Sequence, residues 1–174
     1  VAIAVHPTLA GRIWLGLSDG RLLMSDTYGT TWELRQSFPS AITGILVHPA
    51  IPSELYVLTA KNGVMRALDG GVEFSQQKDS TAKISGGAEI SLGALGVHRG
   101  TVVLTVVTRA GILTSDDRGE SWRVLPLLTS GRQMTAITSF AMAPTNVNRL
   151  VYGTATTIVR SIDGGSQWTV VNSP

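Results

Sequence analysis

A polar, glycine-bearing turn that closes with an aromatic residue occurs four times along the chain. The aromatic residues stand at positions 32, 74, 122 and 168, so successive turns are 42, 48 and 46 residues apart. This period is typical of a four-stranded sheet repeated along a chain, and it does not fit leucine-rich or helical repeats of shorter period. We therefore expect four copies of one structural unit.

Each unit contains the same succession of short β-prone segments. An apolar run comes first, a β-branched and aromatic run follows, and a third run comes after a tight turn. In the second unit these runs are 42–47, 55–59 and 64–67, and the tight turn is Asn62-Gly63. No stretch shows the sustained apolar period of a helix. The pattern predicts an all-β chain, a single β-propeller domain that is complete or part of a larger propeller. Its four visible blades, each a four-stranded antiparallel sheet, are expected at about 1–37, 38–79, 88–127 and 134–173.

The closing turns share the pattern Ser-x-Asp-x-Gly-x-Ser/Thr-Trp. The third unit carries it in full from Ser115 to Trp122, whereas the first has Thr27 in place of the aspartate. The carboxylate can accept hydrogen bonds from turn N–H groups, and the glycine permits a positive φ. We expect the aromatic ring to be buried between neighbouring sheets. The residues predicted to form these structural turns are Ser25, Gly29, Trp32, Asp69, Gly71, Phe74, Ser115, Asp117, Gly119, Trp122, Ser161, Asp163, Gly165 and Trp168.

These turns resemble the Asp-box, or bacterial neuraminidase (BNR) repeat, over nearly the whole chain. Families with this repeat include sialidases, xyloglucan-degrading glycoside hydrolases, sortilin-type receptor domains and photosystem II stability and assembly factors. The second strand and turn from Trp14 to Gly20 and the absence of inserted domains are most similar to the assembly factors and sortilins. The resemblance implies that the boxes lie away from the functional face. It favours a non-catalytic scaffold that binds a protein or glycan partner in an extracytoplasmic setting, whether secreted, periplasmic or at the cell surface.

The loops at the end of each sheet opposite the closing turns form the predicted binding face. Loops held by a rigid scaffold are common recognition sites. The longer stretches 77–87 and 127–133 belong to the same face. The candidate binding residues are Asp19, Arg21, Lys61, Asn62, Arg109 and Thr156.

An enzymatic interpretation finds little support in the residues. The Arg-Ile-Pro signature of sialidases is missing, and the nearest string is Arg12-Ile13-Trp14. Glycosidases use two carboxyl groups that face each other across a cleft. Outside the closing turns and fourth strands the acids are Asp19, Glu54, Asp79 and Glu89, which we interpret as solvated surface groups. No catalytic residue is assigned. The alternative is a fragment of a sialidase-like or xyloglucanase-like glycoside hydrolase whose catalytic residues lie outside this chain.

Metal and cofactor sites are also not predicted. His6, His48 and His98 each follow the first run of their unit, so in a propeller they could form a ring that binds a metal or senses pH. Two of them precede proline and all begin a turn, which favours a solvated or locally hydrogen-bonded histidine. Each closing turn offers too few acidic ligands for calcium.

Composition excludes several other classes of partner. Fourteen basic and twelve acidic side chains are scattered along the chain, so no footprint for nucleic acid is visible. The longest apolar runs are far shorter than a membrane span, and without cysteine there are no disulfides or zinc–thiolate sites. The start at Val1 indicates a processed form or an excised segment. Because an open arc of sheets would expose apolar faces, we expect self-association or further blades to close the ring.

Overall fold

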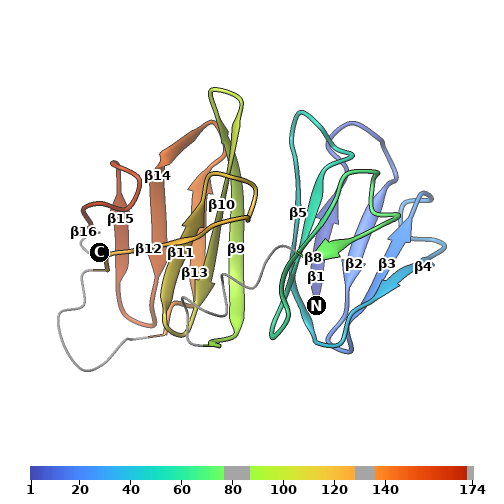
Figure 1. Cartoon of the computed structure of the whole chain (residues 1–174), viewed down its shortest axis with the longest axis horizontal. Helices are drawn as coiled ribbons and strands as arrows, with labels where there is room; N and C mark the ends of the chain where they lie inside the picture. Colours follow the sequence, from blue (N-terminus) through green and yellow to red (C-terminus); the bar gives the residue numbers. More distant parts are fainter. Residues whose placement is uncertain (77–86, 128–135, 172–174) are drawn as a thin grey trace. The chain divides into compact units, whose positions relative to one another are not determined.

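The computed structural model describes residues 1–76, 87–127 and 136–171, and this part of the chain contains strands and turns but no helix (Figure 1). Accordingly, these residues offer no helical segment that could cross a membrane.

The strands form four antiparallel sheets of four strands, each in chain order, so the predicted all-β class is confirmed. The first sheet comprises β1 (Ala2–Val5), β2 (Ile13–Gly16), β3 (Arg21–Ser25) and β4 (Glu33–Ser37), and the second β5 (Ile42–Val47), β6 (Leu55–Thr59), β7 (Gly63–Ala67) and β8 (Ser75–Gln76). The third comprises β9 (Ile90–His98), β10 (Thr101–Thr108), β11 (Gly111–Ser115) and β12 (Arg123–Leu125), and the fourth β13 (Ser139–Ala143), β14 (Asn146–Gly153), β15 (Ile158–Ser161) and β16 (Thr169–Val171).

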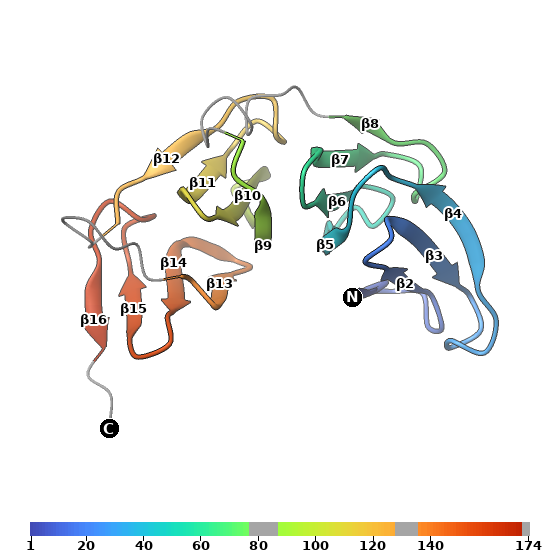
Figure 2. The same cartoon turned by 90° about the horizontal axis from the view of Figure 1, so that it is seen from below.

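The chain divides into two compact units, Val1–Gln77 and Lys78–Pro174, and in each of them two sheets lie face to face (Figure 2). In the first unit, Trp14 of β2 is fully buried and packs with Leu22 and Met24 of β3. These side chains meet Leu55 and Val57 of β6. Because side chains alternate along a strand, one face of each sheet supplies this core.

The second unit has a core of the same kind between β9–β12 and β13–β16. Ile112 and Leu125 from the third sheet pack with Leu150 and Tyr152 from the fourth. The Trp168 ring lies edge-on to Tyr152 at 4.9 Å between centroids, and its indole N–H donates to the Pro126 carbonyl at 2.6 Å. The aromatic residue of the fourth closing turn therefore joins two sheets.

The prediction that the closing aromatic rings are buried is wrong for Trp32. Trp122 and Trp168 expose 7% and 8% of their surface, and Phe74 is half-buried, but Trp32 exposes 37%. Its indole donates to Gly29 as that of Trp122 does to Gly119, so the local geometry is the same. The ring is exposed because no other sheet of the first unit lies against the outer face of β1–β4.

That outer face carries a row of apolar side chains across all four strands. Ile3, Leu15, Leu23 and Leu34 are successive cross-strand neighbours. Ile3 is 66% and Leu34 is 58% exposed.

Candidate functional site

The third closing turn, between β11 and β12, is held together by its own polar groups. Ser115 Oγ donates to Asp117 Oδ1 at 2.7 Å and accepts the Gly119 N–H at 2.8 Å. Asp117 Oδ1 accepts the Ser121 N–H at 2.9 Å. Gly119 has a φ of +93°, which side-chain-bearing residues rarely adopt. Burial raises the pKa of Asp117, but hydrogen bonds from Ser121 and Ser115 outweigh it, and the pKa lies below its ordinary value.

The fourth and second closing turns use their aspartates in the same way. Asp163 Oδ1 accepts the Gln167 N–H at 2.9 Å and the Ser161 hydroxyl at 2.8 Å, and these bonds hold its pKa below the ordinary value. Asp69 accepts the N–H groups of Val72 and Glu73. The carboxylates are therefore engaged with the turns that contain them.

The first closing turn replaces the carboxylate with a hydroxyl. Thr27 Oγ1 accepts the Thr31 N–H at 2.9 Å, so it takes over the hydrogen bond of the missing aspartate. The adjacent Asp26 instead forms an ion pair with Arg12 at 2.6 Å.

The closing turns and the predicted binding loops lie at opposite ends of each sheet. In the first sheet, Ser25 begins the closing turn and pairs with Ile13 at the start of β2, whereas Gly16 pairs with Leu22 beside the β2–β3 turn. The other three sheets have the same order of strands and turns. The closing turns and the candidate binding residues are therefore separated by the length of a strand.

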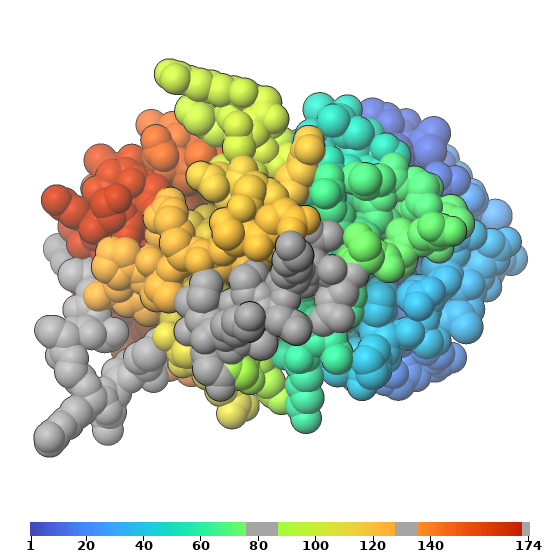
Figure 3. Space-filling view, in the orientation of Figure 1, coloured from blue at the N-terminus to red at the C-terminus, as the bar shows by residue number. Residues whose placement is uncertain are grey.

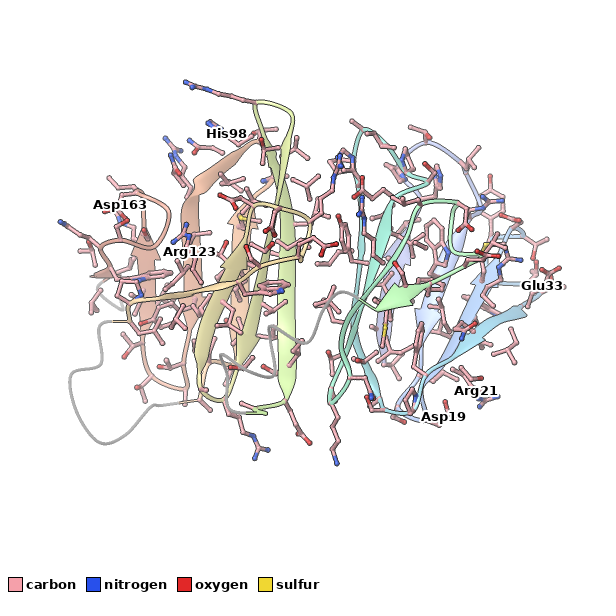
Figure 4. The ribbon with its side chains drawn as sticks, in the orientation of Figure 1. Asp19, Arg21, Glu33, His98, Arg123 and Asp163 are labelled. Carbon is pink, nitrogen blue, oxygen red and sulfur yellow. The ribbon has the colours of Figure 1, made fainter. Side chains whose placement is uncertain are left out.

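The first unit holds four of the candidate binding residues, Asp19, Arg21, Lys61 and Asn62. Asp19 and Arg21 flank the β2–β3 turn and form a half-exposed ion pair at 2.8 Å (Figure 4). The Lys61 N–H donates to Ser40 Oγ at 3.2 Å, and so ties the β6–β7 turn to the connection between β4 and β5. These turns lie at the same end of the unit.

The second unit holds the other two candidates. Arg109 is exposed in the β10–β11 turn. The Thr156 N–H donates to Thr154 Oγ1 at 3.4 Å in the β14–β15 turn. Most of the predicted stretches 77–87 and 127–133 lies outside the described residues.

His6 and His48 are locally hydrogen-bonded, as the sequence predicts. His48 Nδ1 accepts the N–H groups of Ala50 and Ile51, at 3.1 and 2.9 Å. His6 Nδ1 does the same for the two corresponding residues of the first unit, Thr8 and Leu9. The Nδ1 lone pair that accepts these N–H groups is engaged in the turn and is not free to bind a metal. Among the described residues, no three acidic or histidine side chains are placed to hold a metal ion.

The interpretation of Glu54 as a solvated surface group is wrong. Glu54 is 2% exposed, accepts the Tyr56 hydroxyl at 2.5 Å and forms an ion pair with Arg66 at 3.0 Å. The partner comes from the neighbouring strand, so the pair depends on the β6–β7 register. Glu89 is half-buried, and Asp79 lies outside the described residues.

A pocket that the sequence analysis did not predict lies in the second unit, next to the closing turns. It has a volume of about 340 Å³. Its walls come from β9–β12 and from β14, and they include His98, Thr105, Thr114 and Arg123. The sequence signal for it is the pair of threonines at strand positions that hold large apolar side chains in the first unit.

Comparison with known proteins identifies the fold. No family model matches the sequence, and no curated protein sequence matches it. An ancestral GH74 enzyme has a TM-score of 0.77 and 15% identity over 99% of this chain and 24% of the enzyme. YCF48 from Cyanidioschyzon merolae has a TM-score of 0.73 and 17% identity, over 99% of this chain and 56% of that protein. YCF48 bound to D1 peptide has a TM-score of 0.59 and 18% identity, over 92% of this chain and 50% of that protein.

The chain therefore has a β-propeller fold, as the repeats predict, and spans about half or less of each of these proteins. The neighbours include YCF48, a photosystem II assembly factor, so the expected similarity to propellers of that kind is confirmed for the fold.

Proposed function

We propose that this chain is a non-catalytic Asp-box β-propeller scaffold that binds a protein partner through the turns opposite the closing turns. The main support is that the closing-turn carboxylates bond to the turns that contain them. Asp69, Asp117 and Asp163 all accept hydrogen bonds within their own turns, which is the behaviour of a structural motif. The YCF48 structure bound to D1 peptide supports a protein partner rather than a glycan. We propose an extracytoplasmic location for this scaffold, as in the sortilin-type receptor domains that share the repeat.

Site-specific crosslinking tests this proposal. A photoreactive residue replaces Lys61 or Arg109 at the proposed face, and Arg118 at a closing turn is the control position. In native extract, the same crosslinked protein is expected from positions 61 and 109 and not from 118. A product formed only at 118, or glycan-array binding without any crosslinked protein, contradicts the proposal.

A glycoside hydrolase fragment is the second candidate, because the GH74 enzyme superposes on almost the whole chain. In the described residues, Asp19 is paired with Arg21 and Glu54 with Arg66, so neither is a free catalytic acid. A longer version of the protein that releases reducing sugars from xyloglucan, and loses this activity when an added acid is replaced, favours the enzyme.

We also propose that a sheet from a second copy of this chain covers the outer face of β1–β4. Leu15 and Leu23 on this face occupy the positions of Val57 and Met65 in the next sheet, and those two are buried against β1–β4. The exposed face thus has the residues of an existing sheet–sheet interface. Contiguous apolar faces seldom stay exposed on a soluble protein.

Sedimentation velocity over a range of concentrations tests the second-copy proposal. Leu34→Glu is expected to abolish self-association, and Val72→Glu is the control because Val72 is equally exposed, at 58%, in a closing turn. A monomeric wild-type chain, or equal association of both variants, overturns the proposal. So does a longer protein that is monomeric because its own further sheet covers the face.

A further inference from the structure

The pocket in the second unit exists because small polar residues replace large apolar ones. Thr105, Thr114 and Arg123 are cross-strand neighbours on β10, β11 and β12. The corresponding row in the first sheet is Trp14, Met24 and Glu33. Met24 and Thr114 each directly precede the serine that begins a closing turn, which fixes the equivalence.

In the first unit this position is filled. Trp14 is 0% and Met24 is 5% exposed, and both pack in the core between the two sheets. The two threonines are much smaller, so the same place in the second unit contains a hollow of about 340 Å³, large enough for a small ligand.

The pocket combines buried hydroxyl groups with exposed positive charge. Thr105 and Thr114 are 1% and 5% exposed. The Thr114 hydroxyl donates to the Leu104 carbonyl at 3.1 Å. The hydrogen bonds of the Thr105 hydroxyl are longer, 3.3 Å to the Thr114 hydroxyl and 3.8 Å to the Met142 sulfur. The Thr105 hydroxyl is therefore weakly bonded and can turn toward a ligand.

The cationic groups lie at the rim of the pocket. Arg123 and Arg99 are exposed, and neither has an ion pair with another described residue. Arg99 is held at a φ of +50° in the two-residue turn between β9 and β10, which protrudes from the surface of the unit (Figure 3). His98 and Arg123 both line the pocket, and both belong to the second unit (Figure 4). Asp116 is the acidic residue among the lining side chains.

We propose that this pocket binds a small organic carboxylate with a short apolar body. Planar guanidinium groups match the geometry of a carboxylate and bind it through paired hydrogen bonds. The apolar part of the ligand contacts Val103 and Val147, which also line the pocket. A free inorganic anion has no apolar part that could contact these valines. The site is independent of the proposed partner-binding turns, which lie at the other end of the sheets.

Titration of the isotope-labelled chain by NMR tests the site, with 4-methylpentanoate as the probe. We expect saturable shifts of the Thr105 and Thr114 amide signals up to about 20 mM, and at least about tenfold weaker binding of the neutral amide analogue. Arg123→Gln is expected to weaken binding at least about tenfold, whereas Arg35→Gln, in the first unit, leaves it unchanged. Thr114→Met reproduces the filling residue of the first unit and should abolish binding without lowering the melting temperature.

Several results would overturn the proposal. These are no saturable shift with the wild-type chain, equal binding of the amide analogue, unchanged binding by Arg123→Gln, or equal binding by inorganic phosphate. Because Arg123 is exposed, its variant is expected to fold, and the interpretation does not depend on Thr114→Met alone.

Discussion

Truncation of two closing-turn tryptophans is expected to have unequal effects, although their places in the repeat are the same. Trp168 exposes 8% of its surface between two sheets and Trp32 exposes 37% on an uncovered face. The difference of ~30% in exposure is ~70 Å² of a ring-bearing side chain, worth ~2 kcal/mol of burial. Trp168→Ala also leaves a cavity beside Tyr152 and removes the donor to Pro126.

We therefore expect a loss of about 4 kcal/mol for Trp168→Ala and about 1–2 kcal/mol for Trp32→Ala. The difference corresponds to melting temperatures at least ~4 °C apart for a chain of this size. Thermal and urea unfolding followed by far-ultraviolet circular dichroism, at a concentration where the chain is monomeric, measures both losses. Equal losses would refute the reasoning from burial. At higher concentration, Trp32→Ala is expected to weaken self-association, and Trp168→Ala is not.

Three further predictions concern residues that fix the fold. The pKa values of Asp117 and Asp163 in the folded chain lie below the ordinary value of 3.8, so these carboxylates stabilise the fold above that pH and stop doing so as the pH falls through the folded pKa values. Between pH 6 and about 2, the melting temperature of Asp163→Asn is therefore expected to fall less than that of the wild type. Gly165→Ala and Gly70→Ala both place alanine at positive φ, but the new methyl lies 2.6 Å from Leu125 at position 165 and meets nothing at position 70; we expect urea titrations to show Gly165→Ala more destabilising by ~1–3 kcal/mol. Glu54→Ala leaves the partly buried Arg66 without this partner and should cost ~3–5 kcal/mol, whereas the double variant Glu54→Leu/Arg66→Met should recover most of it. Equal melting temperatures of the two variants would contradict this.

The fold could be predicted from the sequence because the residues of each unit indicate its own strands and turns. Glycines at positions 29, 71, 119 and 165 all have positive φ, and the aromatic residue three positions later follows in each case. Such local constraints are visible in a single sequence, since turn chemistry depends on neighbouring residues.

The misjudged residues depend on contacts distant in sequence. Trp32 fits the repeat, but its exposure depends on whether another sheet lies against β1–β4. Glu54 looks like a surface acid until the β6–β7 register places Arg66 beside it. The pocket at Thr105 and Thr114 depends on strand register, which places these small side chains where Trp14 and Met24 lie in the first unit. The candidate binding residues lie in or beside the turns at one end of each sheet, and their role in binding is a prediction.

The most direct test of the proposed division between stabilising and binding ends compares Asp117→Ala with Arg109→Glu, using the purified partner identified by crosslinking. Asp117→Ala should lower the free energy of unfolding by ~1–3 kcal/mol and leave the Kd of the folded protein unchanged. Arg109→Glu should leave unfolding within about 0.5 kcal/mol of the wild type and weaken binding, because an exposed charge affects a partner more than it affects the fold. Loss of partner binding by Asp117→Ala with an unchanged unfolding curve would contradict the account.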